Sequence, residues 1–573
     1  MAVAGRLATC PWEGEPVMTA RRPARVRRRR LTGMERWRAV RRRIPAIPLP
    51  DRGVAGRGVW AGTTRHVSGL ALLFVAGGML VSGLVELGAG DEGPAVLLAA
   101  CITAAVALAL WWPTRPGALD HTAVFTAVGT TWLVASVIGA LPYLLAGTFA
   151  VDGRPWAVVL ADALFESVSG YTASGSTVFG AHNPIEAQGT GVLLYRQLTQ
   201  WAGGMGIVVL VVMVLPALRS SGLGLIDAEA PGMGIDRLAP RIKTTAAWFW
   251  LVYLALTGMV AAGLLVAGMG PFDAVSHAMS AAATGGFSPR DASVGHWDSA
   301  TIEGVLLVAM LLGGASFALH SAVLRERRFG YWRDREFRAY VVVLSISATL
   351  ITVLLVDDGM GIGRAVRSAA FNVVALGTST GFGNATGTGS PGDFTAWASG
   401  PQMVLLLLLV FGGCTGSTSG GVKVMRLRVG MAHAYRTLRG LRKPRALLPV
   451  RLGPTILPES IVERVAGFMV VYGLLVVTGT VVVAALGADL VTAFSGVISA
   501  LGNMGPALGE AGPTASYADA VPTPARVVLS LLMLIGRLEI FPMLLMLVAP
   551  YRRARTASGH AIGAVRERLD GSG

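Results

Sequence analysis

Four short glycine-containing stretches are the residues of this chain best suited to bind an ion. They are Ala173-Ser174-Gly175, Thr284-Gly285-Gly286, Ser379-Thr380-Gly381 and Asn503-Met504-Gly505. A loop that presents backbone carbonyls to a dehydrated cation needs a turn residue that tolerates positive φ, and glycine does so without steric cost. One such stretch is a weak signal, because glycine turns are common. Four of them predict a ring of carbonyl ligands, and hence a cation pore, within a single subunit.

The elements around these stretches repeat in the same order. Each glycine loop follows a short amphipathic run and lies between two long apolar segments, which predicts helix, half-helix, loop and second helix four times. The predicted half-helices cover about 156–170, 272–283, 363–377 and 488–501. The long helices that flank them cover about 121–147 and 190–216, 244–268 and 300–324, 337–356 and 401–428, and 461–486 and 524–549. Two earlier apolar segments, at about 69–88 and 95–112, predict an accessory hairpin without such a loop.

The composition places these helices in a membrane. Of the 573 residues 53% are hydrophobic and only 14% are charged, whereas soluble proteins carry about a quarter of charged residues. We therefore predict an all-α polytopic membrane protein in which about ten spanning helices surround one central pore. No HExxH, GxxxxGK[ST] or GxSxG motif occurs, and Cys10, Cys101 and Cys414 have no metal-ligand spacing. We expect no enzyme, no cofactor in this chain and no transition-metal site.

The distribution of basic residues predicts the orientation. The net charge is +16, and the arginine clusters fall between hydrophobic segments, which favours the positive-inside rule over nucleic-acid binding. The segments predicted to face outside hold one arginine or lysine, Arg290. Both termini are therefore expected in the cytoplasm, and the half-helices are expected to enter from outside. The predicted divisions are a basic, disordered tail that contacts anionic lipid (1–66), an accessory transmembrane hairpin (67–118), four pore repeats (119–243, 244–336, 337–458 and 459–550) and a second tail (551–573).

A polar run interrupts the last helix of the third repeat. Residues 412–421 read Gly-Gly-Cys-Thr-Gly-Ser-Thr-Ser-Gly-Gly, through which no stable helix is expected. Its depth places it beneath the carbonyl ring, so we predict an intramembrane gating loop. The gating residues are Gly412, Gly413, Thr415, Gly416, Ser417, Gly420 and Gly421. The alternative is a glycine kink that allows close helix packing.

Arg537 is the second candidate for gating. It lies in the apolar segment Val527–Leu547, eleven residues past Arg526, which corresponds to roughly 16 Å along a helix. An arginine at that depth is costly and indicates function. We predict an electrostatic barrier in the pore or a tether for the 412–421 loop, the alternative being a buried pair with an acid on another helix. Arg196 and Gln200 are interpreted as packing and hydrogen-bonding groups, not ion ligands.

Several of these stretches together resemble the Trk/Ktr/HKT superfamily of cation uptake proteins, and most of all its TrkH branch. The stretches that carry the resemblance are residues 165–177, 196–207, 283–288, 378–382 and 502–506, and the similarity extends over about 69–550. The accessory hairpin favours TrkH over the shorter KtrB form. The resemblance implies four pore-loop repeats in one subunit, a homodimer in the plasma membrane and a potassium-selective path.

The resemblance also implies roles for individual residues and for a partner. Gly175, Gly286, Gly381 and Gly505 become filter glycines, 412–421 the gating loop, and Arg537 the arginine below the filter. A cytosolic ring of RCK-type subunits, which bind the nucleotide, would control the gate. Serine at the first filter glycine marks sodium-selective members, so Gly175 favours K⁺. Two filter loops depart from the family pattern, Ala173-Ser174 slightly and Asn503-Met504 more strongly. A Na⁺-permeable or ion-coupled (H⁺ or Na⁺) carrier therefore remains the alternative.

Overall fold

The computed structural model describes residues 57–90, 94–114, 121–151, 153–220, 242–327, 329–442, 448–453, 455–540 and 543. All of them belong to the unit that spans Gly56–Gly573. The predicted tail at 551–573 and most of the predicted tail at 1–66 lie outside the described residues. Those two predictions are therefore not tested by the structure.

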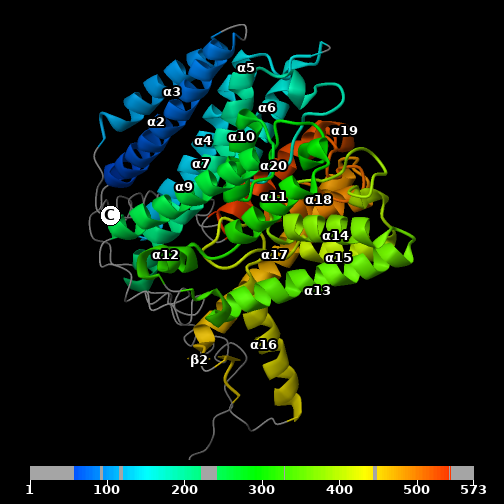
Figure 1. The fold of residues 1–573 in the computed structure, drawn as a ribbon. Helices are drawn as coiled ribbons and strands as arrows, with labels where there is room; N and C mark the ends of the chain where they lie inside the picture. Colours follow the sequence, from blue (N-terminus) through cyan, green and yellow to red (C-terminus); the bar gives the residue numbers. More distant parts are fainter. Residues whose placement is uncertain are drawn as a thin grey trace, which may run out of the picture. The chain divides into compact units, whose positions relative to one another are not determined.

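The N-terminal hairpin consists of α2 (Arg57–Ala89) and α3 (Ala95–Trp111), which lie side by side (Figure 1). Small residues allow the close approach, because a Cβ on Gly69 would lie 2.8 Å from the backbone of Trp111. The helix α2 begins at Arg57, before the predicted boundary at residue 66, but its part that could span a membrane begins at Thr64, so the predicted boundary stays a prediction. Apolar content marks the part of a helix that lies in hydrocarbon, whereas backbone hydrogen bonding continues beyond it.

Four groups of helices follow, each with a short buried helix in the middle. The first contains α4 (His121–Ile138), α5 (Leu141–Leu145), α6 (Trp156–Tyr171) and α7 (Thr190–Ser220). The second contains α9 (Ile242–Val266), α10 (Pro271–Ala283), α11 (Ala300–Gly313) and α12 (Phe317–Glu326). The third contains α13 (Arg335–Asp357), α14 (Ile362–Gly377), α15 (Ser399–Leu408) and α16 (Val424–Arg442). The fourth contains α17 (Glu459–Ala485), α18 (Leu490–Gly502), α19 (Tyr517–Ala520) and α20 (Thr523–Arg537).

The core lies around the short helices, and the long ones face outward. Residues 495–502 of α18 are all buried, and α18 packs against both α17 and α20 (Figure 1). By contrast, α13 exposes Val342, Ile346 and Val353. An apolar outer face on a long helix is what contact with lipid requires.

By length and composition, five of the described helices are long and apolar enough to cross a membrane, or six when the bent pair α11 and α12 counts as one span. The shorter apolar helices include α3 and α15. The predicted number of ten spans therefore stays a prediction. A small antiparallel pair of strands, β1 (Arg451–Leu452) and β2 (Thr455–Ile456), also departs from the all-α prediction.

Two predicted second helices are not continuous. The segment expected as one helix over 300–324 bends by 95° between α11 and α12. Gly313 and Gly314 favour the break, and residues of the 412–421 loop satisfy the freed backbone groups: Cys414 N–H donates to Gly314 O (2.8 Å) and Phe317 N–H to Gly416 O (3.0 Å). The helix expected over 524–549 ends at Arg537, and Glu539 follows with a φ of 55°.

Candidate functional site

The four short helices α6, α10, α14 and α18 end in the same way. The residue at each end, Ala173, Thr284, Ser379 or Asn503, has a φ of 50–55°. The N–H of the next residue donates back five positions, from Ser174 to Ser169, Gly285 to Ser280, Thr380 to Ala375 and Met504 to Ser499, at 2.8–3.0 Å. This is a Schellman cap with a residue other than glycine in the left-handed position. The sequence predicts positive φ only at the glycines.

The filter glycines come two residues after these caps and also have positive φ. The values are +85° for Gly175, +82° for Gly286, +85° for Gly381 and +93° for Gly505. The residue between each cap and its glycine does not have positive φ. The sign of φ therefore alternates over three residues of every loop, positive at the cap residue, negative at the next residue and positive at the glycine. Such alternation turns successive carbonyl groups toward one side of the chain, as a carbonyl-lined cation site needs.

The four loops form a closed ring in chain order. Each filter glycine packs against the backbone of the next loop: a Cβ on Gly175 would lie 2.2 Å from Gly285 O, one on Gly286 2.1 Å from Thr380 O, one on Gly381 2.0 Å from Met504 O, and one on Gly505 3.0 Å from Ser174 O. Every predicted filter stretch therefore contributes to one ring. We call each contact between a filter glycine and the next loop a joint. At three of the four joints no side chain fits, because the atom that a Cβ would meet is a backbone oxygen.

One amide side chain, that of Gln200, forms hydrogen bonds with the backbone of the second loop. Gln200, in α7, donates to Gly285 O (2.7 Å) and accepts from Phe287 N–H (3.0 Å) and the Ser280 hydroxyl (2.7 Å). Its side chain is fully buried, so these bonds are not exchanged with water. Gln200 is a hydrogen-bonding group, as predicted, and its partners belong to the ring.

A buried ion pair supports the first and second loops together. Arg196 Nε donates to Glu166 Oε1 (2.7 Å), and its Nη1 donates to Ser288 O (2.8 Å). The guanidinium lies 3.5 Å from the centre of the Phe287 ring. Glu166 in turn accepts from the Thr177 hydroxyl and Val178 N–H, each at 3.0 Å. The pair joins the segments that follow Gly175 and Gly286, and breaking it would leave a buried charge uncompensated.

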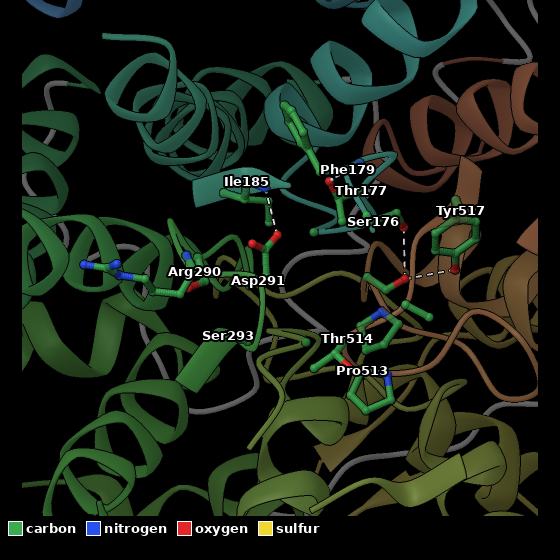
Figure 2. A pocket seen from close by; sticks show the side chains of 18 of the residues that line it. Ser176, Thr177, Phe179, Ile185, Arg290, Asp291, Ser293, Pro513, Thr514 and Tyr517 are labelled. Carbon is green, nitrogen blue, oxygen red and sulfur yellow. Dashed lines mark hydrogen bonds between the residues drawn. The ribbon is translucent and has the colours of Figure 1, made fainter. Parts of the chain in front are cut away.

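A cavity of about 270 Å³ lies against the ring, on the side of the residues that follow the glycines (Figure 2). All four filter glycines line it, together with Ser176, Arg290, Asp291 and Tyr517 among others. The hydrogen bond to Asp273 (2.8 Å) raises the pKa of the Arg290 guanidinium, which therefore stays charged. Asp291 accepts from Ile185 N–H at 2.8 Å and so links the polar segments of two repeats (Figure 2).

The 412–421 run lies against the other side of the ring. The Thr418 hydroxyl donates to Ala282 O (3.1 Å), and the Ser419 hydroxyl donates to Thr378 O (2.6 Å). Gly420 N–H donates to the Ser379 hydroxyl (2.6 Å), and a Cβ on Gly420 would lie 2.0 Å from Gly502 O. The loop therefore contacts the ends of α10, α14 and α18.

The remaining predicted gating residues hold the loop's own shape. Gly412 N–H donates to Val422 O (2.9 Å), which closes the base of the loop. A Cβ on Gly413 would lie 2.5 Å from Gly314 O. The Ser417 hydroxyl donates to Cys414 O (2.7 Å). Gly416 and Gly421 have φ of +75° and +66°, which favours glycine at both turns.

Arg537 joins this loop to the first repeat. Its Nη1 donates to Thr418 O (2.9 Å) and its Nη2 to Gly203 O of α7 (3.0 Å). The side chain is 2% exposed. Among the described residues its partners are carbonyls and not carboxylates. Glu539, two positions further on, pairs instead with Arg426 at 2.6 Å.

Two charged residues that sequence analysis did not assign to the gate hold the ends of the loop. Lys423 Nζ donates to Ser419 O and the Ser417 hydroxyl. Glu336, in α13, accepts from Thr415 N–H (2.8 Å) and the Thr415 hydroxyl (3.0 Å). The position of Lys423 directly after the polar run was a usable signal. Glu336 lies 79 residues before Thr415, so no local pattern reveals it.

Comparisons with known proteins agree with this arrangement. The family model of TrkH, a cation transport protein, matches residues 92–553. The chain is 35% identical over 497 residues to the Trk system potassium uptake protein TrkH of Escherichia coli strain K12, covering 86% of this chain and 99% of that protein. It is 39% identical over 426 residues to TrkH of Halomonas elongata, covering 74% and 84%. The crystal structure of the potassium transporter TrkH from Vibrio parahaemolyticus superimposes with a TM-score of 0.75 at 34% identity, covering 85% of this chain and 98% of that one.

Proposed function

This chain belongs to the TrkH family of cation transport proteins and is a multi-pass membrane transporter, not an enzyme; from that premise we propose that it takes up potassium ions through the ring of Gly175, Gly286, Gly381 and Gly505. The single observation that carries the proposal is the closed ring, in which each glycine packs against a carbonyl of the next loop. The relatives named as potassium uptake proteins support the choice of ion.

Electrostatics favour a cation at this place. The C-terminal ends of α6, α10, α14 and α18 all converge on the ring. Each such end carries about half a negative elementary charge from its helix dipole. Alternation of the backbone turns carbonyl dipoles in the same direction, so a dehydrated ion finds ligands that replace its water. The filter ligands are the three residues of each stretch, from Ala173 to Gly175 and their counterparts in the other loops.

The proposed organisation follows the repeats. An accessory hairpin (67–118) precedes pore repeats at 119–243, 244–336, 337–458 and 459–550, with ten spans in all and tails at both ends in the cytoplasm. The excess of arginine in the segments between repeats supports this orientation in the plasma membrane. The match to a TrkH structure over 85% of the chain supports the four-repeat pore.

The 412–421 loop and Arg537 form the gate in this proposal. The loop lies across the ends of α10, α14 and α18, directly beneath the ring, so an ion passes only when it moves. Arg537 holds it in the closed position through Thr418 O. A cytosolic RCK-type subunit that binds the nucleotide would move the loop, and two copies of the chain would form a homodimer, as the family resemblance implies.

The test is potassium uptake in cells that lack their own uptake systems, at low external K⁺, with and without a co-expressed RCK-type subunit. Growth rescue that follows K⁺ and is unaffected by Na⁺ is the expected result, and dependence on the partner is expected for the gate. The second candidate is a Na⁺-permeable or ion-coupled carrier, which the divergent fourth loop Asn503-Met504 favours. Uptake that requires Na⁺ or a proton gradient would replace the first proposal by the second.

A further inference from the structure

The carbonyl of Gly505 differs from those of the other three filter glycines. It accepts hydrogen bonds from the hydroxyls of Ser176 (3.0 Å), Ser499 (3.1 Å) and Tyr517 (2.9 Å), two of which are drawn in Figure 2. Within the described part of the chain, the carbonyls of Gly175, Gly286 and Gly381 accept none. The four loops therefore share one backbone conformation, but their glycine carbonyl oxygens are not equally free to bind an ion.

Three donors saturate this oxygen. A carbonyl oxygen offers two lone pairs, and three hydroxyls around it leave no free direction for a further ligand. An ion that used Gly505 O would first have to displace one of the hydroxyls. The other three glycine carbonyls carry no such cost, so the coordination shell at this level is asymmetric.

Tyr517 is held so that its hydroxyl keeps this position. Its N–H donates to Thr177 O (2.9 Å), which ties α19 to the first filter loop. Its ring packs against Phe165 with 5.6 Å between centroids, and the residue is 2% exposed. A tyrosine fixed by its backbone and its ring loses little entropy when its hydroxyl forms a hydrogen bond.

The joint made by Gly505 is also the loosest of the four. A Cβ on Gly505 would lie 3.0 Å from Ser174 O, whereas the other joints have 2.0–2.2 Å. The residue whose carbonyl is held by hydroxyls is thus the one packed least tightly against its neighbour. Both observations set the fourth loop apart from the other three.

We propose that the hydroxyls of Tyr517, Ser176 and Ser499 withdraw the Gly505 carbonyl from ion coordination, which makes Tyr517 a residue that determines selectivity. The inference rests on the proposed function, because it assigns a ligand set to that same ring. Preference for K⁺ over Na⁺ depends on the number and field strength of the carbonyls that surround the ion. A shell with one carbonyl withdrawn discriminates less than a complete one.

The test uses Tyr517→Phe, Ser176→Ala and the double variant in the full chain, reconstituted in liposomes. Tyr517→Phe keeps the ring and removes only the hydroxyl. Either single variant leaves two hydroxyls on the two lone pairs of Gly505 O, so the ratio of K⁺ to Na⁺ flux should rise clearly in the double variant, by about two- to tenfold, the value of one net hydrogen bond. The double variant should exceed either single one. A variant that only destabilised the protein would lower the K⁺ flux and the Na⁺ flux alike and would leave their ratio unchanged.

The matched control is Tyr195→Phe, which removes a buried tyrosine hydroxyl whose partners are Gly139 O (2.8 Å) and the Tyr171 hydroxyl (3.3 Å), and not a carbonyl of the ring. Its flux ratio should equal that of the wild-type protein. An unchanged or lower ratio in the double variant of Tyr517 and Ser176, with K⁺ flux retained, would overturn this inference and leave the proposed function intact. A wild-type chain that carries no K⁺ would overturn the proposed function itself, and the inference with it.

Discussion

The ring of filter glycines and the 412–421 loop are both glycine-rich, both non-helical and in direct contact, yet they are built differently. In the ring, four loops of like conformation pack against one another through backbone atoms. Among the described residues, the other repeats show no loop of this length, although the second repeat has a shorter break between α11 and α12. It too has close backbone contacts, but the charged side chains of Arg537, Lys423 and Glu336 bond directly to it. In the ring, the charged pair Arg196 and Glu166 instead bonds the residues that follow the filter glycines.

The proposed function needs one part that stays fixed and one part that moves, and this difference fits that need. A Cβ added to a filter glycine could be accommodated only if a whole loop moved, because the two backbone segments in contact each follow a capped helix end. A side-chain hydrogen bond is worth about 0.5–1.5 kcal/mol, or 1.5–3 kcal/mol when one group is charged, and can be exchanged for another partner. These properties support the proposal that the ring selects the ion and the loop gates its path.

The largest effect is expected where the ring is tightest. Gly286→Ala places a Cβ 2.1 Å from Thr380 O at a φ of +82°. K⁺ uptake should fall by more than about tenfold, since a left-handed alanine alone costs about 1–2 kcal/mol before the clash is counted. The measurement is initial uptake at low external K⁺, normalised to the amount of protein in the membrane.

Gly304→Ala is the control for that substitution. Gly304 lies within α11, and a Cβ there meets no atom within 4 Å. Its uptake should remain at the wild-type level. Wild-type uptake in Gly286→Ala would show that the ring is not the ion path.

Removing Arg537 tests the anchoring of the loop and distinguishes its two predicted roles. Arg537→Ala deletes the bonds to Thr418 O and Gly203 O, and K⁺ flux without a partner subunit should rise by about tenfold. Arg537→Lys keeps the charge but lacks the forked guanidinium that spans two carbonyls. We expect it to resemble the alanine variant, as a tether requires.

The opposite result has a definite meaning. If Arg537→Lys behaves like the wild-type protein while Arg537→Ala does not, the charge matters and the residue is an electrostatic barrier. Arg364→Ala, at an exposed position near the start of α14, is the control and should leave flux unchanged.

A smaller loss is expected at the fourth joint of the ring. Gly505→Ala also has an unfavourable φ, +93°, but its Cβ would lie 3.0 Å from the nearest oxygen. Uptake should fall by about fivefold to thirtyfold from backbone strain alone, less than in Gly286→Ala, where the clash with backbone oxygen is added. The same uptake assay compares the two variants side by side. Equal losses would show that the four joints are equivalent in solution.

The smallest effect is expected at the end of the loop. Lys423→Met removes donors to Ser419 O and the Ser417 hydroxyl, and flux without a partner should rise by less than in Arg537→Ala, that is by less than about tenfold, because Lys423 bonds only within the loop and does not join it to another helix. Arg439→Met removes one positive charge from an exposed position of α16 and is the control. A rise of the same size in both variants would assign the effect to charge and not to the loop.

The sequence by itself determined the elements and their order. Local patterns were enough for this prediction. Apolar segments of sufficient length predict the helices, glycine stretches after amphipathic runs predict the loops, and arginine between the segments predicts the orientation. The break at 412–421 and the buried position of Arg537 were visible for the same reason. Local signals did not reveal where the broken helices end, because the 95° bend between α11 and α12 depends on bonds from Cys414 and Gly416.

Only the tertiary structure decided how these parts meet. The ring closes between Gly505 and Ser174, and Asn503 donates to the Ser174 hydroxyl across 329 positions. The two carbonyls that Arg537 binds belong to residues 119 and 334 positions away. Likewise, the three hydroxyls on the Gly505 carbonyl come from three different segments. Such contacts depend on which surfaces come together in the folded chain, and no spacing along the sequence encodes them.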